Sequence, residues 1–475
     1  MQRFLPRSWL DSARQVLAVV LVAIGAAAFA VVFRMAIGLV FVHVYRAPDV
    51  LRAFESLPWE ARLLVPAVGG ALAGAMSFFA SRFKGGRGVS DVMEAVVLGG
   101  RHISLRFASA TALGSWFAIV SGGSIGREGP IIQFGGGLGV AVSRTLHLDE
   151  TRTRSLVAAG TAAGFAAAYN TPLAAVLFVV EIVTGVVALD VVLPVIVATP
   201  IATALTRLAI GGGPIYGQRT FTMHSEFELL AHGLLGLLAG IVGPLFMLLL
   251  NRGEEAFSKM RLPRAVRAAS GGLLVGALAI FLPEITGNGY EAINLILGGG
   301  VTVGLMLVLL VAKAFATTAS VSSGSPGGVF TPTLFLGAAL GGVFAHALAS
   351  VSPPGAVGGI GGYALVGMAA LTAATTHAPL LGAVMIFELS GDYAIVLPLL
   401  VATASATLLS RFIRQNSVYM EELHRRGTAW EVTIDGRRVR QPSGESVDDG
   451  NRGAPVRSID ALETGRAAPK AVDSE

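Results

Sequence analysis

Two scarcities set the first limits on this chain. Its 475 residues include no cysteine, which excludes disulfide bonds and thiolate metal sites. Charged residues make up 14% of the chain, against about 25% in an average soluble domain. Hydrophobic residues make up 53%. This balance excludes an ordinary soluble protein.

Uncharged apolar runs take the place of the missing charge. Val16–Phe33 and Leu63–Ala80 each come close to the roughly 20 residues that cross a bilayer. Basic residues gather in short clusters between such runs, as in loops that face the cytoplasm. We therefore predict an all-α, multi-pass protein of the cell (inner or plasma) membrane that contacts lipid. The net charge of +5 is explained by these basic loop clusters, so we expect no nucleic-acid partner.

A repeat divides the membrane part into two halves. The segment Gly126-Arg127-Glu128-Gly129-Pro130 corresponds to Gly328-Val329-Phe330-Thr331-Pro332. Downstream, Asn170-Thr171-Pro172 corresponds to His377-Ala378-Pro379. Glycine and proline interrupt the apolar segments at matching places, which predicts a substrate site near the bilayer midplane where the halves meet.

The polar stretches suggest the domain limits. We predict a cytoplasmic N-terminal segment at 1–15, a first membrane half at 16–250, a linker at 251–267 and a second half at 268–426. The remaining residues, 427–475, form a polar cytoplasmic tail. We expect the tail to be disordered except for a hairpin at Asp435-Gly436.

Glu128 is the leading functional candidate. Arg127 and Glu128 lie between uncharged runs, at a depth where ionisable groups are costly and usually functional. Gly129 permits close backbone approach, and Pro130 suits the first turn of a helix. A carboxylate beside a helix N-terminus can occupy an anion site and leave it when it is protonated or displaced, which makes it a gate. The alternative is a buried ion pair between Arg127 and Glu128.

Three further sites are candidates for anion binding. The backbone amides of Val329 and Phe330 open a helix with no acidic residue nearby, although glycine-mediated helix packing would also explain the motif. Gly86 and Arg87 belong to a glycine-flanked basic segment that can attract anions or be an ordinary cytoplasmic loop. Tyr419 can donate a hydrogen bond to an anion or be an interfacial tyrosine.

Other features have plainer interpretations. Glu181 and Glu388 occupy equivalent repeat positions, which favours a structural role such as accepting hydrogen bonds from loop amides. The segment Gly122-Gly123-Ser124-Ile125-Gly126 fits the G-x-S-x-G pattern of serine hydrolases. No strand precedes Ser124, so an intramembrane serine protease is only a remote alternative and no enzyme is expected. Neither a metal nor a cofactor is expected.

These motifs together resemble the CLC family of chloride channels and chloride/proton antiporters. Gly126–Pro130 resembles the family's gating-glutamate motif, Gly328–Pro332 its G-x-F-x-P motif, and Tyr419 its pore tyrosine. The resemblance implies an antiparallel, inverted-repeat fold in which broken helices meet at an anion site. It also implies a homodimer with one pore per subunit. In the family, the glutamate matching Glu128 competes with chloride, which the amides matching Val329 and Phe330 help to hold.

Two positions depart from the family pattern. Arg87 stands where the family has a serine that touches the central anion. Ile182 stands where antiporters have a proton-relaying glutamate. Ile182 favours channel-like chloride conduction gated by Glu128. Chloride/proton antiport and transport of another small anion, such as fluoride or nitrate, are the alternatives.

Overall fold

The structure is a computed structural model. It describes residues 6–83, 88–99, 103–213, 215–217, 221, 223, 225, 227–425, 429–433, 436–440 and 457–458. The chain forms two compact units, Met1–Gln415 and Asn416–Glu475. The first unit contains the membrane part and the second contains the tail.

The first unit is built from helices, as composition predicts. Within the described residues, eight helical segments are long and apolar enough to cross a membrane. Several other apolar helices have only 10–17 residues, too few for the roughly 20 that a crossing needs. Such broken helices are tolerated at membrane depth where protein surrounds their ends. The prediction of an all-α, multi-pass fold is confirmed.

The elements of the first half follow one another in chain order. They are α1 (Pro6–Val40), the π-helical turn η1 (Phe41–Tyr45), α2 (Val50–Ser56), α3 (Trp59–Ala80), α4 (Val89–Val97), α5 (Leu105–Val120), α6 (Glu128–Thr145), α7 (Glu150–Tyr169), α8 (Pro172–Leu177), the π-helical turn η2 (Phe178–Thr184) and α9 (Leu189–Ile210).

The second half repeats most of this series. It contains α10 (Glu228–Lys259), α11 (Arg264–Phe281), the 3-10 turn η3 (Pro283–Ile285), α12 (Tyr290–Leu297), α13 (Val303–Ser322), α14 (Phe330–Val351), α15 (Ile360–Thr376), α16 (Pro379–Ser390), the 3-10 turn η4 (Tyr393–Ile395) and α17 (Val396–Ile413).

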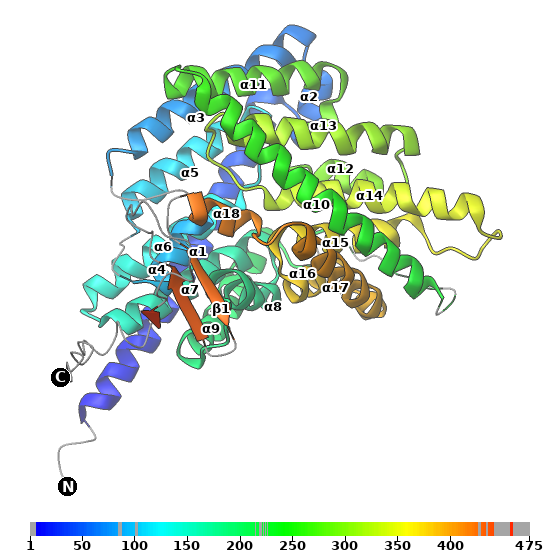
Figure 1. Ribbon diagram of the computed structural model, residues 1–475. Coiled ribbons are helices and arrows are strands. Elements are labelled where there is room, and N and C mark those ends of the chain that lie inside the picture. The colour runs from blue at the N-terminus through cyan, green and yellow to red at the C-terminus, as the bar shows by residue number, and fades with distance from the viewer. Residues whose placement is uncertain are drawn as a thin grey trace, which may run out of the picture. The chain divides into compact units, whose positions relative to one another are not determined.

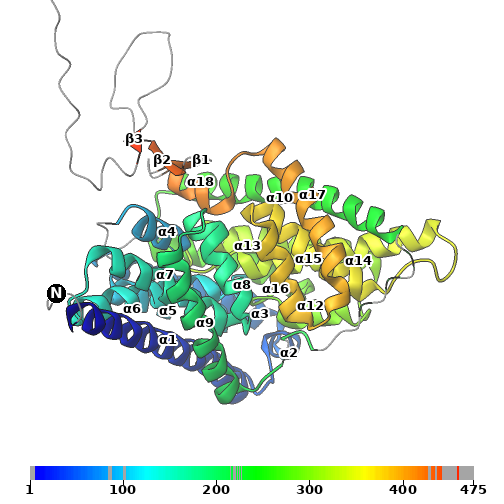
Figure 2. The ribbon, with the colours of Figure 1, turned by 90° about the horizontal axis from the view of Figure 1, so that it is seen from below.

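Packing within each half follows the same plan. Helix α6 packs on α7 as α14 packs on α15, α3 packs on α5 as α11 packs on α13, and α1 packs on α9 as α10 packs on α17. Figures 1 and 2 show α4, α6, α7 and α9 gathered on one side and α14, α15 and α17 on the other. The halves join where α3 packs on α11 and α8 packs on α16. The repeat seen in the sequence is therefore a repeat of structure.

The predicted linker at 251–267 is wrong. Residues 251–259 are the last turns of α10, and α11 begins at Arg264. The matching elements place the division between the halves before α10, after Ile210. The physical reason is length. The 32 residues of α10 span about 48 Å, more than the roughly 30 Å of a hydrocarbon core, so its polar end extends the helix beyond the apolar zone.

The motif residues end one helix and begin the next. Asn170 and His377 close α7 and α15 in the left-handed conformation, with φ of 60° and 58°. Pro172 and Pro379 then stand in the first turn of α8 and α16, where the missing N–H of proline loses no hydrogen bond. The two halves thus break their helices by the same local device.

Within its described residues, the second unit contains one helix and a small antiparallel sheet. Strands β1 and β2 pair antiparallel, with Thr433 opposite Gly436, where the sequence predicts a hairpin. The expectation of disorder beyond this hairpin is wrong for residues 457–458, which pair with β2. The elements are α18 (Val418–Arg425), β1 (Ala429–Thr433), β2 (Gly436–Arg440) and β3 (Arg457–Ser458).

Candidate functional site

Two loops from different halves meet as a single backbone bridge. The Gly126 N–H donates to the Gly328 carbonyl at 2.8 Å, and the Gly328 N–H donates to the Gly126 carbonyl at 2.9 Å. Helix α6 begins two residues after the first glycine and α14 two residues after the second. Both helices therefore begin close to this bridge, and each N-terminus carries N–H groups that have no acceptor within their own helix and a partial positive charge.

The carboxylate of Glu128 bonds to the start of the opposite helix. Its Oε1 accepts from the Phe330 N–H at 3.0 Å and from the Thr331 N–H at 3.4 Å. Its Oε2 accepts from the Thr331 hydroxyl at 3.0 Å. The side chain is 1% exposed. A negatively charged group thus fills the N-terminal end of α14, which is a favourable place for an anion.

Glycine is required on both sides of this carboxylate. A Cβ at Gly328 would lie 2.0 Å from Oε1 of Glu128, and a Cβ at Gly126 would lie 2.1 Å from Oε2. Gly129 also lies at the junction, since its Cβ would be 3.5 Å from the Gly328 amide nitrogen. The glycines of the two motifs therefore leave room for the Glu128 side chain.

Thr331 and Tyr169 extend the contacts of Glu128. The Thr331 hydroxyl has one proton, which it donates to Glu128, so it accepts from the Tyr169 hydroxyl at 2.9 Å. The Tyr169 ring also packs on Phe330 with 5.7 Å between centroids. Sequence reasoning did not name either residue as part of the site. Thr331 belongs to the Gly328–Pro332 motif, and Tyr169 directly precedes the Asn170-Thr171-Pro172 motif, which is the only signal for either residue.

Arg127 turns away from an ion pair with Glu128. It is the N-cap residue of α6 and is 8% exposed. Its guanidinium donates to the Ala168 carbonyl at 3.3 Å and lies over the Tyr290 ring at 4.9 Å. The alternative explanation of Glu128 as the ion partner of Arg127 therefore does not fit, because Glu128 bonds to α14.

The remaining predicted anion-site residues lie in different parts of the chain. Val329 is the N-cap residue of α14, next to Phe330. Gly86 and Arg87 lie outside the described residues. Tyr419 belongs to the second unit, where it lies on α18. Ile182 lies in η2 and is buried.

Glu181 and Glu388 cap helices across the two halves. Glu181 accepts from the amides of Leu380 and Leu381 at the start of α16, at 3.2 and 2.7 Å. Glu388 accepts from the amides of Leu173 and Ala174 at the start of α8, at 3.0 and 2.8 Å. The predicted structural role of this pair is confirmed.

The geometry gives the protease alternative no support. The Ser124 hydroxyl pairs with the Thr317 hydroxyl at 3.0 Å, and Ser124 is fully buried. His377 instead lies 3.4 Å from the Ser410 hydroxyl. Ser124 is therefore a packing residue between the halves.

Lys313, on α13, is a fully buried cation. Its ammonium donates to the carbonyls of Ile285 and Gly287, at 2.8 and 2.9 Å. It also lies 5.2 Å from the centroid of the Phe335 ring. Lys313 thus holds the turn before α12 against α13 and α14.

Comparison with known proteins gives consistent results. The sequence profile described as "Voltage gated chloride channel" matches residues 69–411. A putative chloride channel protein, ClcB-like, from Ralstonia nicotianae is 42% identical over 378 residues, covering 78% of this chain and 87% of that protein. A voltage-gated ClC-type chloride channel, ClcB, from Escherichia coli strain SMS-3-5 is 34% identical over 374 residues, covering 77% and 87%.

Solved structures share the fold. A slow cyanobacterial Cl⁻/H⁺ antiporter superimposes with a TM-score of 0.78 at 23% identity, covering 87% of this chain and 98% of that one. A CLC-type fluoride/proton antiporter gives a TM-score of 0.70 at 20% identity, covering 88% and 98%. The two-half architecture with broken helices is the architecture of these proteins.

Proposed function

This chain belongs to the voltage-gated chloride channel (CLC) family, and from that premise we propose that it carries chloride across the membrane under the control of Glu128. The observation that carries the proposal is the position of the Glu128 carboxylate on the Phe330 and Thr331 amides. The N–H groups that hold a carboxylate oxygen can hold chloride in its place. Glu128 and chloride then compete for one electropositive helix end.

Glu128 acts as a gate because its hold on α14 depends on charge. An ionised carboxylate accepts three hydrogen bonds there. Charge-assisted hydrogen bonds are about twice as strong as neutral ones, so protonation weakens this hold. A protonated or displaced side chain leaves the amides to the permeating anion. Chloride flux therefore rises when Glu128 is neutral or absent.

Ile182 favours conduction without proton coupling. It is a buried apolar side chain in η2 and cannot carry a proton. We therefore propose channel-like chloride transport. The two antiporters that share the fold are less than 25% identical to this chain, so their proton coupling does not transfer to it. Chloride/proton antiport remains the alternative that the experiment below tests.

Two further parts of the pathway belong to the proposal. Val329 and Phe330 supply backbone amides to the central anion. Tyr419, in the second unit, stays a predicted donor of a hydroxyl to an anion. The segment with Gly86 and Arg87 stays a sequence-based part of the proposal: Arg87 stands where the family has a serine, and we expect this exchange to change anion selectivity. Replacing Arg87 with serine then alters chloride affinity or selectivity. An unchanged affinity would return Arg87 to the role of an ordinary loop charge.

The remaining elements of the proposal concern assembly and location. We place the protein in the plasma or inner membrane as a homodimer with a separate pore in each subunit. Multi-pass insertion itself follows from the family and from the apolar helices.

Paired flux measurements test the proposal. Purified protein in proteoliposomes is given a chloride gradient while chloride and proton electrodes record both ions. We expect chloride movement without uphill proton movement. We also expect Glu128→Gln and Glu128→Ala to remove the pH dependence of the flux. Uphill proton transport would show that the protein is an antiporter and not a channel. An unchanged pH response in the Glu128 variants would contradict the gating role of Glu128. Competition by fluoride or nitrate identifies the preferred anion.

A further inference from the structure

In each of the helices α1, α7 and α9, a charged segment is followed by a long uncharged one. Helix α1 has no charged residue from Gln15 to Phe33, α7 has none after Arg154, and α9 has none between Asp190 and Arg207. The three helices pack on one another. These transitions lie around one pocket, which places the pocket at the boundary between a polar interface and the apolar membrane interior.

The pocket has a volume of about 500 Å³ and two kinds of wall. Its polar end is formed by Gln15, Asp149, Thr151, Arg152 and Asp190. Its apolar end is formed by aliphatic side chains of α1 and α9. Two of these, Leu193 and Val197, are 58% and 46% exposed. A molecule that fills this pocket must therefore combine a charged group with a hydrocarbon chain.

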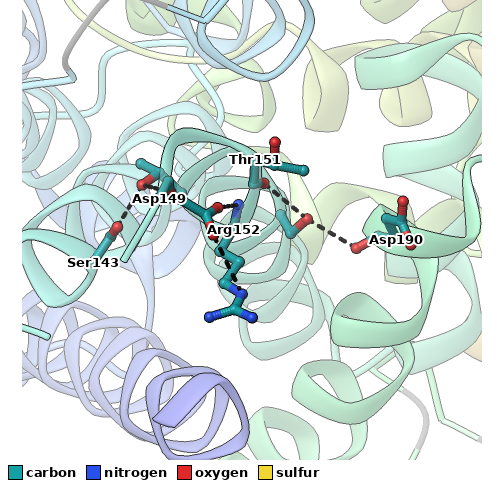
Figure 3. A network of polar contacts seen from close by, with 7 residues as sticks. Ser143, Asp149, Thr151, Arg152 and Asp190 are labelled. Carbon is teal, nitrogen blue, oxygen red and sulfur yellow. Dashed lines mark hydrogen bonds and ion pairs between the residues drawn. The ribbon is translucent and has the colours of Figure 1, made fainter. Parts of the chain in front are cut away.

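Arg152 presents a cation at the polar end. Asp149 accepts from the Arg152 backbone N–H at 2.8 Å, and its second oxygen lies 3.5 Å from Nε of Arg152. The two terminal guanidinium nitrogens make no hydrogen bond to any residue that the structure describes. Figure 3 shows this guanidinium pointing away from the helix that carries it. These nitrogens can bind the oxygens of a phosphate, as arginine commonly does.

Asp190 supplies the opposite charge. Its backbone carbonyl accepts from the Ser155 hydroxyl at 2.8 Å, which fixes the start of α9 beside α7 (Figure 3). Its carboxylate is exposed, and within the described part of the chain it makes no hydrogen bond. The polar end thus has two carboxylates and one guanidinium. This balance disfavours a ligand of net negative charge and suits one with a phosphate and an amine.

We propose that this pocket binds a phospholipid with a phosphoethanolamine head group. Arg152 holds the phosphate, Asp190 accepts hydrogen bonds from the ammonium, and an acyl chain covers Leu193 and Val197. The site is separate from the anion site at Glu128, so it does not depend on the proposed transport function. It gives the protein a preference among membrane lipids.

The absence of cysteine permits a single-site test. Leu193→Cys introduces the only thiol of the chain. Its rate of reaction with a maleimide is measured in detergent, with and without added phosphatidylethanolamine. We expect the lipid to slow labelling severalfold. With Arg152→Ala added to this variant, the lipid concentration that gives half of the protection should rise about tenfold, because a hydrogen bond to a charged group is lost.

Arg144→Ala is the matched control. Arg144 is exposed at the end of α6, outside the pocket, and its removal changes the net charge equally. Asp190→Asn should abolish the preference for phosphatidylethanolamine over phosphatidylglycerol with the same chains. Equal effects of Arg152→Ala and Arg144→Ala would overturn the proposal. So would labelling that depends on protein concentration and not on lipid, since a second copy would then cover the pocket.

A second measurement guards against misfolding of the Arg152 variant. Leu193→Trp adds bulk at the apolar end of the pocket and leaves Asp149 and Arg152 in the sequence. Native mass spectrometry should detect retained phosphatidylethanolamine on the unmodified chain and less on this variant. Equal retention by both proteins would also overturn the proposal.

Discussion

Replacing Gly328 with alanine should open the gate without changing Glu128 itself. The three nearest atoms to a Cβ at this position are Oε1, Cδ and Cγ of Glu128, at 2.0, 2.6 and 3.0 Å. Gly328 is not among the residues with positive φ, so alanine fits its backbone. The added methyl group therefore conflicts with the flexible end of one side chain.

The size of the conflict decides the outcome. Non-bonded atoms settle at roughly 3.5 Å, so Oε1 must move by about 1.5 Å from its present 2.0 Å. Such a movement breaks a 3.0 Å hydrogen bond to the Phe330 N–H. A hydrogen bond to a charged group contributes about 1.5 kcal/mol or more, and this corresponds to roughly tenfold in the open fraction.

The assay is initial chloride efflux from proteoliposomes at neutral pH. We expect Gly328→Ala to raise the rate about tenfold, within the limit set by the Glu128→Ala variant. Its response to acid should be smaller than that of the unmodified protein, because the carboxylate is already displaced. Gly304→Ala serves as the control, since a Cβ there meets no atom within 4 Å in the part of the chain that the structure describes.

A double variant provides the strict test. When Glu128 is already alanine, the side chain that conflicts with a Cβ at Gly328 is gone. Gly328→Ala should then leave the efflux rate unchanged. An equal increase in both backgrounds would refute the reasoning, because the methyl group would be acting on something other than Glu128.

Three further predictions concern hydrogen bonds around the site. Thr331→Val removes one donor to Glu128 and should raise efflux about fivefold. Thr375→Val should not, because the Thr375 hydroxyl donates to the Leu371 and Thr372 carbonyls of its own helix α15. Glu181→Ala and Glu388→Ala should each lower the free energy of unfolding by about 1–2 kcal/mol and by similar amounts, as measured by thermal unfolding in detergent. Lys313→Met leaves two buried carbonyls without their donor and should lower the free energy of unfolding by about 2 kcal/mol or more in the same assay. A Tm within about 1 °C of that of the unmodified protein would contradict this prediction.

The sequence predicted the broad architecture because membrane helices are a matter of length and composition. The missing charge and the apolar runs sufficed for the all-α, multi-pass fold. The repeated motifs sufficed for the two halves. The linker was misplaced because polarity alone does not end a helix. Asn251 and the charged residues after it continue α10, since a helix satisfies its own backbone hydrogen bonds wherever it emerges.

The candidate site was predictable in part. The repeat indicated that Glu128 and Phe330 belong to equivalent helix starts, and the structure brings their loops together. The Thr331 and Tyr169 hydroxyls were not predictable as partners, because one lies in each half and their contact depends on how the halves pack. The pocket at Arg152 was not predictable from the sequence for a similar reason. It is formed by α1, α7 and α9, which are distant in sequence.

Carboxylate caps between the two halves come as a reciprocal pair, except at the candidate site, where the cap has no counterpart. Carboxylates of one half cap helix starts of the other, as Glu181 does for α16 and Glu388 for α8. These two caps are reciprocal, since each half gives one carboxylate to a helix start of the other. Glu128 also caps a helix of the other half, but its repeat counterpart is Phe330, which has no charge to return. One carboxylate therefore faces a junction of two electropositive helix ends. The excess of positive charge that remains when Glu128 leaves is what a passing anion would neutralise.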